Sequence, residues 1–304
     1  MIRFIVNPTA GANRARKKWP VLESYARSVL KEFDVVFTEY HLHAIKIARE
    51  SSIEGIETLV AVGGDGTTNE VVNGIYLAKK TVTLGIIDCG TGADFVKTVS
   101  VGNNYMEAID TLKNGIIRNF DIVEVEYTTF SGNSATRIFV NAADAGLGGD
   151  TVINVDGAPK VLGGKLAFLY GVLRSIVNLK TYKISLNIDG VEIGKFNIIS
   201  TIVANGRYFA GGMYIAPMAK PDDGKLEIIL IKKTTRRKFV KNLPLVYKGE
   251  HVYIDEVEHF TGREIRLNSH EEVMLEMDGE LTGKLPATFR IREKALRIIT
   301  KREV

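Results

Sequence analysis

The sequence predicts two domains, an α/β domain over residues 1–125 and a mostly antiparallel β-sandwich domain over residues 126–304. In the first part, short apolar runs alternate with amphipathic helical patterns, which is typical of a doubly wound domain with a parallel sheet. In the second part, short strands follow one another with polar turns between them. A chain of 304 residues is also long for a single domain. The pattern allows the last strand to return to the first domain.

The first domain is expected to contain four strands, each a short run of apolar residues bounded by turn signals. Its first helix is identified by apolar residues three or four positions apart between Trp19 and Val29. The predicted strands are Ile2–Val6, Val35–Thr38, Leu59–Val62 and Thr83–Ile87, and further helices are expected after Ala44, at Val71–Leu77 and near Met106–Leu112. Because strands and helices take turns, the strands should lie parallel in one sheet.

The second domain is expected to be built from short strands, with helices at Lys165–Val177 and Thr235–Tyr247. The Asp189-Gly190 pair between two apolar runs predicts a tight hairpin turn. The predicted strands are Ile122–Tyr127, Thr136–Asn141, Tyr182–Ile188, Asn197–Ala204, Leu226–Lys232, Ile254–Phe260, Glu264–Leu267, Val273–Met277 and Phe289–Arg292.

Composition excludes several classes of protein. No apolar run approaches the roughly 18 residues of a membrane-spanning helix, and no signal peptide precedes the first strand, so we expect a cytoplasmic protein. The net charge of +4 is too small to indicate nucleic acid as a partner. The single cysteine, Cys89, is expected to be a buried structural residue. The basic cluster between Lys232 and Lys241 is either a solvated helix face or a surface that contacts an anionic membrane.

The segment Gly63–Glu70 lies between an apolar strand and a helical pattern, and it predicts a phosphate site. Its three glycines allow close approach of the backbone, and amides at the start of a helix favour an anion. A carboxylate such as Asp65 is compatible with phosphates mainly where a cation such as Mg²⁺ bridges them. In a purely structural alternative, Thr67 and Glu70 form a capping box and the glycines serve packing.

Three further motifs follow strands of the same predicted sheet. Asn7–Gly11 follows the first strand, Thr38 ends the second, and Gly90–Asp94 follows the fourth. Because ligands of such folds lie at the carboxyl ends of the strands, these motifs and Gly63–Glu70 should belong to one site.

Together these motifs resemble the diacylglycerol kinase catalytic-domain family, which includes bacterial lipid kinases and sphingosine kinases. Asn141–Gly148, Ala216–Leu226 and Met277–Glu280 look like the later motifs of that family, in the same order. The resemblance implies ATP and Mg²⁺ as cofactors, bound in a cleft between the two domains. The residues that it places near ATP are Asn7, Pro8, Thr9, Ala10, Gly11, Thr38, Gly63, Gly64, Asp65, Gly66, Thr67, Thr68, Asn69, Glu70, Thr91 and Asp94.

The resemblance also implies roles for acidic residues of the second domain. Asp278 or Glu280 would be the base that takes the proton of the acceptor hydroxyl, with Asp65 near the transferred phosphate. A second, structural Mg²⁺ would be held by Asp223 and by backbone carbonyls near Lys220 and Lys225. From the residues alone, Asp278-Gly279 is either part of a site or a hairpin turn, and Asp223-Gly224 reads as a turn before a strand. Ala93 departs from the asparagine that much of the family carries before Asp94.

The expected function is therefore ATP- and Mg²⁺-dependent phosphorylation of a hydroxyl group on diacylglycerol or a related lipid. One alternative is a soluble kinase of the NAD kinase type, which shares the Gly-Gly-Asp-Gly core, and another is a nucleotide-binding sensor without catalysis. The lipid substrate would be met at the membrane surface, so the protein would be cytoplasmic and peripheral. The sequence leaves a homodimer open.

Overall fold

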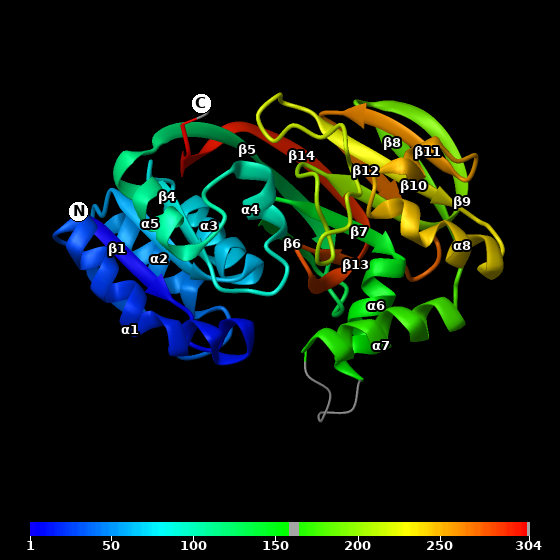
Figure 1. The fold of residues 1–304 in the computed structure, drawn as a ribbon. Helices are drawn as coiled ribbons and strands as arrows, with labels where there is room; N and C mark the ends of the chain where they lie inside the picture. The colour runs from blue at the N-terminus through cyan, green and yellow to red at the C-terminus, as the bar shows by residue number, and fades with distance from the viewer. Residues whose placement is uncertain (158–163, 303–304) are drawn as a thin grey trace. The chain divides into compact units, whose positions relative to one another are not determined.

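The computed structural model describes residues 1–157 and 164–302, and the chain divides into two compact units (Figure 1). Unit 1 contains residues 1–122 together with the segment from Glu293 onward. Unit 2 contains Val123–Arg292. Unit 2 is therefore inserted into unit 1 along the chain, and the long last strand belongs to both.

Unit 1 is an α/β domain whose strands pair in the order β14-β4-β3-β1-β2. All four of these strand pairs are parallel. Its elements are β1 (Ile2–Val6), α1 (Ala10–Leu30), β2 (Asp34–Phe37), α2 (His43–Ile53), β3 (Thr58–Gly63), α3 (Asp65–Ala78), β4 (Thr83–Asp88), α4 (Asp94–Val99), α5 (Tyr105–Asn114) and the end of β14 (Glu280–Thr300). The carboxyl ends of β1, β3 and β4 therefore lie at one edge of the sheet.

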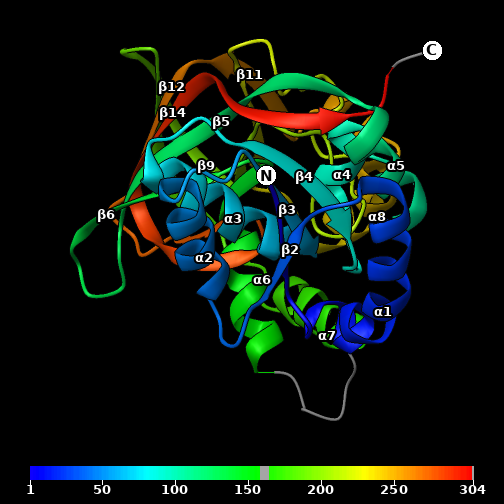
Figure 2. The ribbon, with the colours of Figure 1, turned by 90° about the vertical axis from the view of Figure 1, so that its left-hand side faces the viewer.

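Helices cover both faces of the unit 1 sheet, as Figure 2 shows. Alternate residues of β1 and β3, such as Phe4 and Val60, pack with Trp19 and Leu22 of α1 and with Ile109 of α5. The residues between them point to the opposite face, where α2 packs against α3. Both faces are apolar, which is why these strands read as continuous hydrophobic runs.

Unit 2 is rich in antiparallel strands. Its elements are the second part of β5 (Ile116–Thr128), which begins in unit 1, then β6 (Ser134–Phe139), β7 (Ala142–Gly146), α6 (Leu147–Asp156), α7 (Gly164–Val177), β8 (Tyr182–Ile188), β9 (Val191–Ala204), β10 (Leu226–Lys232), α8 (Arg236–Val246), the 3₁₀ helix η1 (Glu250–Tyr253), β11 (Val257–Gly262), β12 (Glu264–Asn268), β13 (Met274–Met277) and the first part of β14. The predicted β-rich second domain is thereby confirmed.

Strand pairing in unit 2 closes into a ring, β9-β7-β13-β14-β12-β8, which returns to β9. The closure depends on two long strands. β9 pairs with β8 along its first half and with β7 along its second half, and β14 pairs first with β13 and then with β12. The two sheets of the predicted sandwich are therefore joined through these strands, around a core that includes Phe139, Leu186 and Phe289.

The structure contains elements that were not predicted. Segment 142–148, for which no strand or helix was predicted, forms strand β7 and the start of helix α6, and the short helix α4 was not expected. The last strand is 21 residues long, whereas the pattern indicated only Phe289–Arg292. Within the residues that the structure describes, no helix is long and apolar enough to cross a membrane.

We expect Phe289→Ala to lower the free energy of unfolding by about 3–5 kcal/mol, because it empties a fully buried position in the ring core. Phe289 packs edge-on against Phe139, with ring centroids 6.3 Å apart. Urea unfolding followed by circular dichroism measures the loss. Phe130→Ala is the matched control, since Phe130 is 52% exposed and should change stability by no more than about 0.5 kcal/mol. Equal effects of the two substitutions would contradict the assigned core.

Candidate functional site

The loops after β1, β3 and β4 are in close backbone contact at one edge of the unit 1 sheet. A Cβ atom on Gly11 would lie 2.1 Å from the carbonyl oxygen of Cys89, and one on Gly90 would lie 2.8 Å from the Cα of Gly64. Gly11 also has a φ of 61°, in the left-handed region. Glycine is therefore required at these contacts, and the structure brings the three predicted motifs together.

The Asn7 side chain links the first of these loops to helix α3. Its Nδ2 donates to Thr67 Oγ1 at 3.0 Å, and its Oδ1 accepts from the backbone N and the hydroxyl of Thr9. Pro8 and Ala10 lie in the same loop, which continues into a stretch of left-handed backbone at Gly11–Asn13. The first loop is thus held against the start of α3.

The start of α3 has the features of an anion site. Its N-cap is Gly64, which has no side chain to accept from the first amides, and those amides have no acceptor within the helix. A Cβ on Gly63 would lie 2.3 Å from Thr67 Oγ1, so glycine leaves room for this hydroxyl. Gly66, Thr68 and Asn69 belong to the helix itself. Free amides at a helix start fit a phosphate group.

Asp65 and Asp94 are close neighbours in this site. The Asp65 carboxylate accepts from the backbone N of Asp94 at 3.3 Å and of Phe95 at 3.2 Å, so it also caps α4. Burial, followed by the charge of Asp94, raises the pKa of Asp65. Lys97 Nζ lies 3.4 Å from Asp94 Oδ1. A cation bound here would relieve the repulsion between the two carboxylates.

Glu70 and Thr38 lie beside this site. The capping box of Thr67 and Glu70 is wrong, because the Glu70 carboxylate accepts instead from the backbone N of Leu42 and Ala44 at the start of α2. Thr38 is 8% exposed, and its N donates to the carbonyl of Val6. Thr91 is exposed. Glu70 thus fixes α2 against α3.

The structure places three further residues at these loops, namely Asp88, Arg14 and Ala93. Asp88 ends β4, and burial, with the charge of Asp65, raises its pKa from 3.8 to about 6. Arg14 donates to the carbonyl of Gly90 at 3.0 Å. Ala93 has a φ of 55°, where asparagine is better tolerated than alanine. An acidic residue directly after the apolar run Thr83–Ile87 was the signal for Asp88, although its burial depends on the neighbouring loops.

The chemistry of this set fits a metal-bound nucleotide. Amides at the start of α3 are donors for phosphate oxygens, and the carboxylates of Asp65, Asp88 and Asp94 are the hard oxygen ligands that Mg²⁺ prefers. Unit 1 therefore contains a site that fits ATP with Mg²⁺.

In unit 2, Asp278 is held by three backbone donors. Its Oδ1 accepts from the N of Asn141 and Ala142 at 3.0 and 3.1 Å, and its Oδ2 accepts from the N of Val140 at 3.0 Å. Asp278 and Gly279 both have positive φ and form the two-residue turn between β13 and β14. The carboxylate has one fixed orientation.

Asp189 has the same kind of environment in the β8–β9 hairpin. Its Oδ1 accepts from the N of Arg263 and Glu264, and its own N donates to the carbonyl of Glu264, just as the N of Asp278 donates to Ala142. The bonds of Asp278 alone therefore do not distinguish a base from a structural turn. Glu280 differs, because Arg137 forms a short ion pair with it.

The predicted structural metal ligands lie in a turn before β10. Asp223 is exposed, and its Oδ1 accepts from the backbone N of Lys225 at 3.1 Å. Lys220 and Lys225 are exposed as well. This geometry is that of an Asx turn, and a carboxylate beside backbone carbonyls also fits a hard cation.

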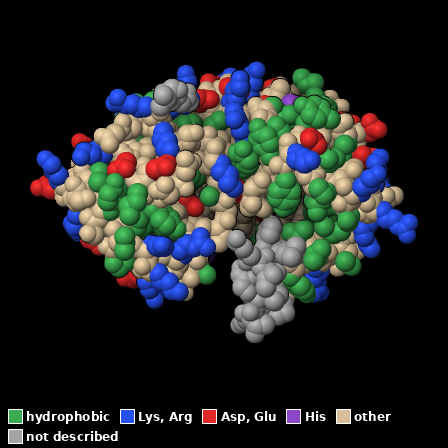
Figure 3. Space-filling view, viewed as in Figure 1, with side chains coloured by type: hydrophobic (Ala, Val, Ile, Leu, Met, Phe, Trp, Pro, Cys, Tyr) green, Lys and Arg blue, Asp and Glu red, His purple; other side chains and the backbone are tan. Residues whose placement is uncertain are grey.

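Helix α8 presents basic and apolar side chains on the same surface (Figure 3). Lys232 and Lys238 are paired with Glu258 and Glu256. No ion pair within the described residues involves Arg236, Arg237, Lys241 or Lys248. Exposed apolar neighbours are Val240 at 48%, Tyr247 at 55% and Tyr253 at 86%.

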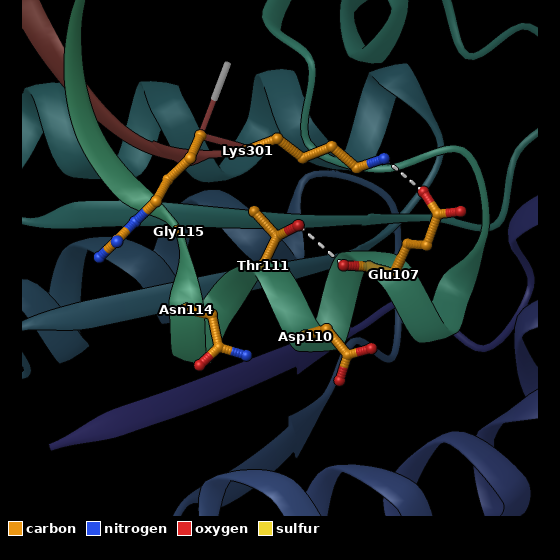
Figure 4. Close-up of a pocket in the computed structure, with 7 residues that line it drawn as sticks. Glu107, Asp110, Thr111, Asn114, Gly115 and Lys301 are labelled. Carbon is orange, nitrogen blue, oxygen red and sulfur yellow. Dashed lines mark hydrogen bonds and ion pairs between the residues drawn. The ribbon is translucent and has the colours of Figure 1, made fainter. Parts of the chain in front are cut away.

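A pocket of about 320 Å³ lies elsewhere in unit 1 (Figure 4). It is lined by Glu107, Asp110, Thr111, Asn114, Gly115, Lys301 and Arg302, and an ion pair joins Lys301 to Glu107. No residue of the predicted motifs contributes to it. We therefore place the candidate site at the strand ends rather than in this pocket.

Comparisons with known proteins agree with this geometry. Residues 1–125 match the diacylglycerol kinase catalytic domain, and residues 143–300 match the YegS C-terminal NAD kinase beta sandwich-like domain. The chain belongs to the diacylglycerol kinase catalytic-domain family. It is 26% identical over 309 residues to a diacylglycerol kinase of Bacillus subtilis, with 99% of this chain and 96% of the relative covered. The relative from Staphylococcus aureus strain MRSA252 is 28% identical over 303 residues, with 99% and 93% covered.

Solved structures share the fold. A crystal structure of a diacylglycerol kinase from Bacillus anthracis superposes with a TM-score of 0.75 at 21% identity, and 99% of this chain and 96% of that chain are covered. The family is one of phosphotransferases with an alcohol group as acceptor. The predicted family and enzyme class are therefore confirmed.

We expect Asp88→Asn to remove a pH dependence of stability. Because the folded protein holds the Asp88 proton up to a pKa of about 6, the free energy of unfolding falls as the pH rises from about 4 to 6. Asparagine keeps the acceptor for the Gly90 amide and does not titrate. Between pH 4 and pH 7 the variant should gain about 2–3 kcal/mol relative to wild type. Urea unfolding at both pH values is the measurement, and Asp255→Asn, at an exposed aspartate, should show no such gain.

Proposed function

We propose that this family member transfers the γ-phosphoryl group of ATP, with Mg²⁺, to a hydroxyl group of diacylglycerol or a closely related lipid. The observation that carries the proposal is the contact of three glycine-containing loops around the amides of α3, with Asp65, Asp88 and Asp94 beside them. Such a set serves phosphoryl transfer, which depends on charge neutralisation and positioning.

Each unit would contribute a separate part of the reaction. In unit 1, the first amides of α3 would hold phosphate oxygens, and Asp65 with Asp94 would hold the catalytic Mg²⁺. When bound, Mg²⁺ supplies positive charge that offsets the negative charge of the phosphates. Arg14 is held to Gly90 and would keep the fourth-strand loop in place. In unit 2, a carboxylate would orient the acceptor hydroxyl and take its proton.

We assign the base to Asp278 rather than Glu280. The guanidinium of Arg137 holds Glu280 in an ion pair. Three backbone N–H groups hold the Asp278 carboxylate in one orientation, and Asp278 is half-buried beside the exposed Gly279, so its position suits a base that must meet an acceptor hydroxyl. Glu280 with Arg137 would then position the strand that follows the turn. Asp223, with carbonyls near Lys220 and Lys225, would hold a structural Mg²⁺.

The deciding experiment incubates the protein with labelled ATP, Mg²⁺ and diacylglycerol in anionic vesicles, and in parallel with NAD. Radiolabelled phospholipid that disappears on addition of EDTA is the expected result. Label in NAD without label in lipid would overturn the proposal in favour of a soluble NAD kinase. Nucleotide binding without transfer to any lipid of a total extract would instead support a sensor.

We expect Asp278→Asn to lower kcat by about 10²–10⁴-fold, because it removes the base from the reaction. The substitution will also destabilise unit 2, because the Asp278 carboxylate accepts hydrogen bonds from three backbone N–H groups. Asp189→Asn is the matched control, since it disturbs an equivalent turn. Both variants should lose stability in urea, and only Asp278→Asn should lose kcat. A similar loss of kcat in both would assign Asp278 a structural role.

We also propose that unit 2 contacts the membrane through the α8 surface formed by Arg236, Arg237, Val240, Lys241, Tyr247, Lys248 and Tyr253. Unpaired basic groups are attracted to anionic headgroups, and exposed aromatic and aliphatic side chains favour the interface. The combination supports peripheral attachment, as expected for a protein that acts on a lipid.

Replacing Arg236, Arg237 and Lys241 together with Gln should weaken binding to phosphatidylglycerol vesicles by about tenfold or more, because each basic residue near an anionic surface contributes about 1 kcal/mol. Vesicle sedimentation measures this. A triple variant with the same charge change, at the exposed Lys31, Lys80 and Lys113 of unit 1, should bind as wild type. Equal weakening in both would indicate a net-charge effect rather than a specific surface.

A further inference from the structure

Two buried carboxyl groups lie side by side beneath the Asp278-Gly279 turn. Glu276 of β13 and Asp144 of β7 are direct partners in an antiparallel pair, so their side chains leave the same face of the sheet. Their exposed fractions are 1% and 3%. Like charges at such positions repel, and burial strengthens the repulsion.

No cation offsets these carboxyls within the part of the chain that the structure describes. Asp144 accepts from Gly148 N at 3.2 Å and, through a short hydrogen bond, from the Ser200 hydroxyl. Glu276 Oε2 accepts from Gly279 N at 2.8 Å, and Glu276 Oε1 has no hydrogen-bond partner among the described residues. Two negative charges in this environment would be strongly unfavourable.

The surroundings distinguish the two groups. The Asp144 carboxylate reaches from β7 to the first turn of α6, where it accepts from Gly148 N and the helix amides favour a negative charge. A side chain at position 148 would come within 2.7 Å of Asp144. Burial raises the pKa of Glu276 well above its usual range, and the charges of the facing Asp144 and of Asp278 in the turn raise it further. Burial raises the pKa of Asp144 to about 7, with a smaller contribution from Asp150 of α6.

We propose that Asp144 and Glu276 share one proton at neutral pH, held mainly by Glu276, and that Glu276 is a positioning residue for Asp278. The hydrogen bond from Gly279 N to Glu276 Oε2 fixes the second residue of the turn, while the amides of residues 140–142 fix the first. A proton on Glu276 keeps a second negative charge away from the base. The positioning role rests on the proposed function, whereas the shared proton does not.

The shared proton is tested without an activity assay. Because the folded protein retains a proton that the unfolded chain loses, the urea midpoint of wild type should fall as the pH rises from about 5 to 8. Glu276→Gln removes the group that mainly holds the proton and should abolish most of this fall, whereas Asp144→Asn removes the neighbouring charge and should move the fall to lower pH. If neither variant changes the profile in this way, the shared proton is refuted, even where lipid phosphorylation is confirmed.

The positioning role is tested by kinetics at pH 6.5. Glu276→Leu removes the acceptor for Gly279 N, and kcat should fall by about tenfold or more, with KM for ATP within about twofold of wild type because the proposed ATP contacts belong to unit 1. Glu276→Gln keeps an acceptor oxygen and should recover at least about half of the wild-type kcat. An unchanged kcat in Glu276→Leu, or a Gln variant as slow as the Leu variant, would overturn the positioning role. Should Glu276→Leu not fold, the Gln variant alone decides, since a drop of tenfold there contradicts the proposal.

Discussion

Backbone N–H groups at the ends of helices and strands impose the constraint on which most of this structure depends. A buried amide without an acceptor destabilises a fold, and here carboxylates from distant parts of the chain supply the acceptors. Asp65 accepts from the start of α4, Glu70 from the start of α2, and Asp278 from the segment between β6 and β7. Each of these contacts fixes one loop against another.

The same carboxylates are the groups on which phosphoryl transfer would depend. A carboxylate that accepts hydrogen bonds from two or three backbone N–H groups keeps a single orientation. It is therefore already in place in the folded protein, and no free energy is needed to reorient it during the reaction. In the proposed reaction, the same carboxylate atoms of Asp65 and Asp278 would therefore serve both the fold and the chemistry. Because one carboxylate would serve both fold and reaction, loss of activity in a variant does not by itself identify a catalytic group. A control variant is needed in a turn that has equivalent hydrogen bonds and no proposed part in the reaction, and Asp189 provides it.

Most of the unit 1 elements could be predicted, because their apolar runs and helical spacing are local signals. The glycines of Gly63–Glu70 indicated the anion site for the same reason. What the sequence could not reveal were contacts between distant residues, such as the 26-residue step from Glu70 to Ala44, or the pairing of Asp144 with Glu276 across two strands. The closure of the unit 2 strands into a ring could not be predicted either, because the alternation of apolar residues along a strand does not determine which strands pair.

The shared strand β14 has a consequence for how the molecule is made. Its residues Arg297 and Ile298 pair with β4, and they follow all of unit 2 along the chain. During synthesis, β4 is therefore an open sheet edge until unit 2 has left the ribosome. Exposed edges can pair with other chains, and domains tend to fold as they emerge. Because of this insertion, the sheet of unit 1 is completed last, and a truncated chain would leave that sheet without its edge strand.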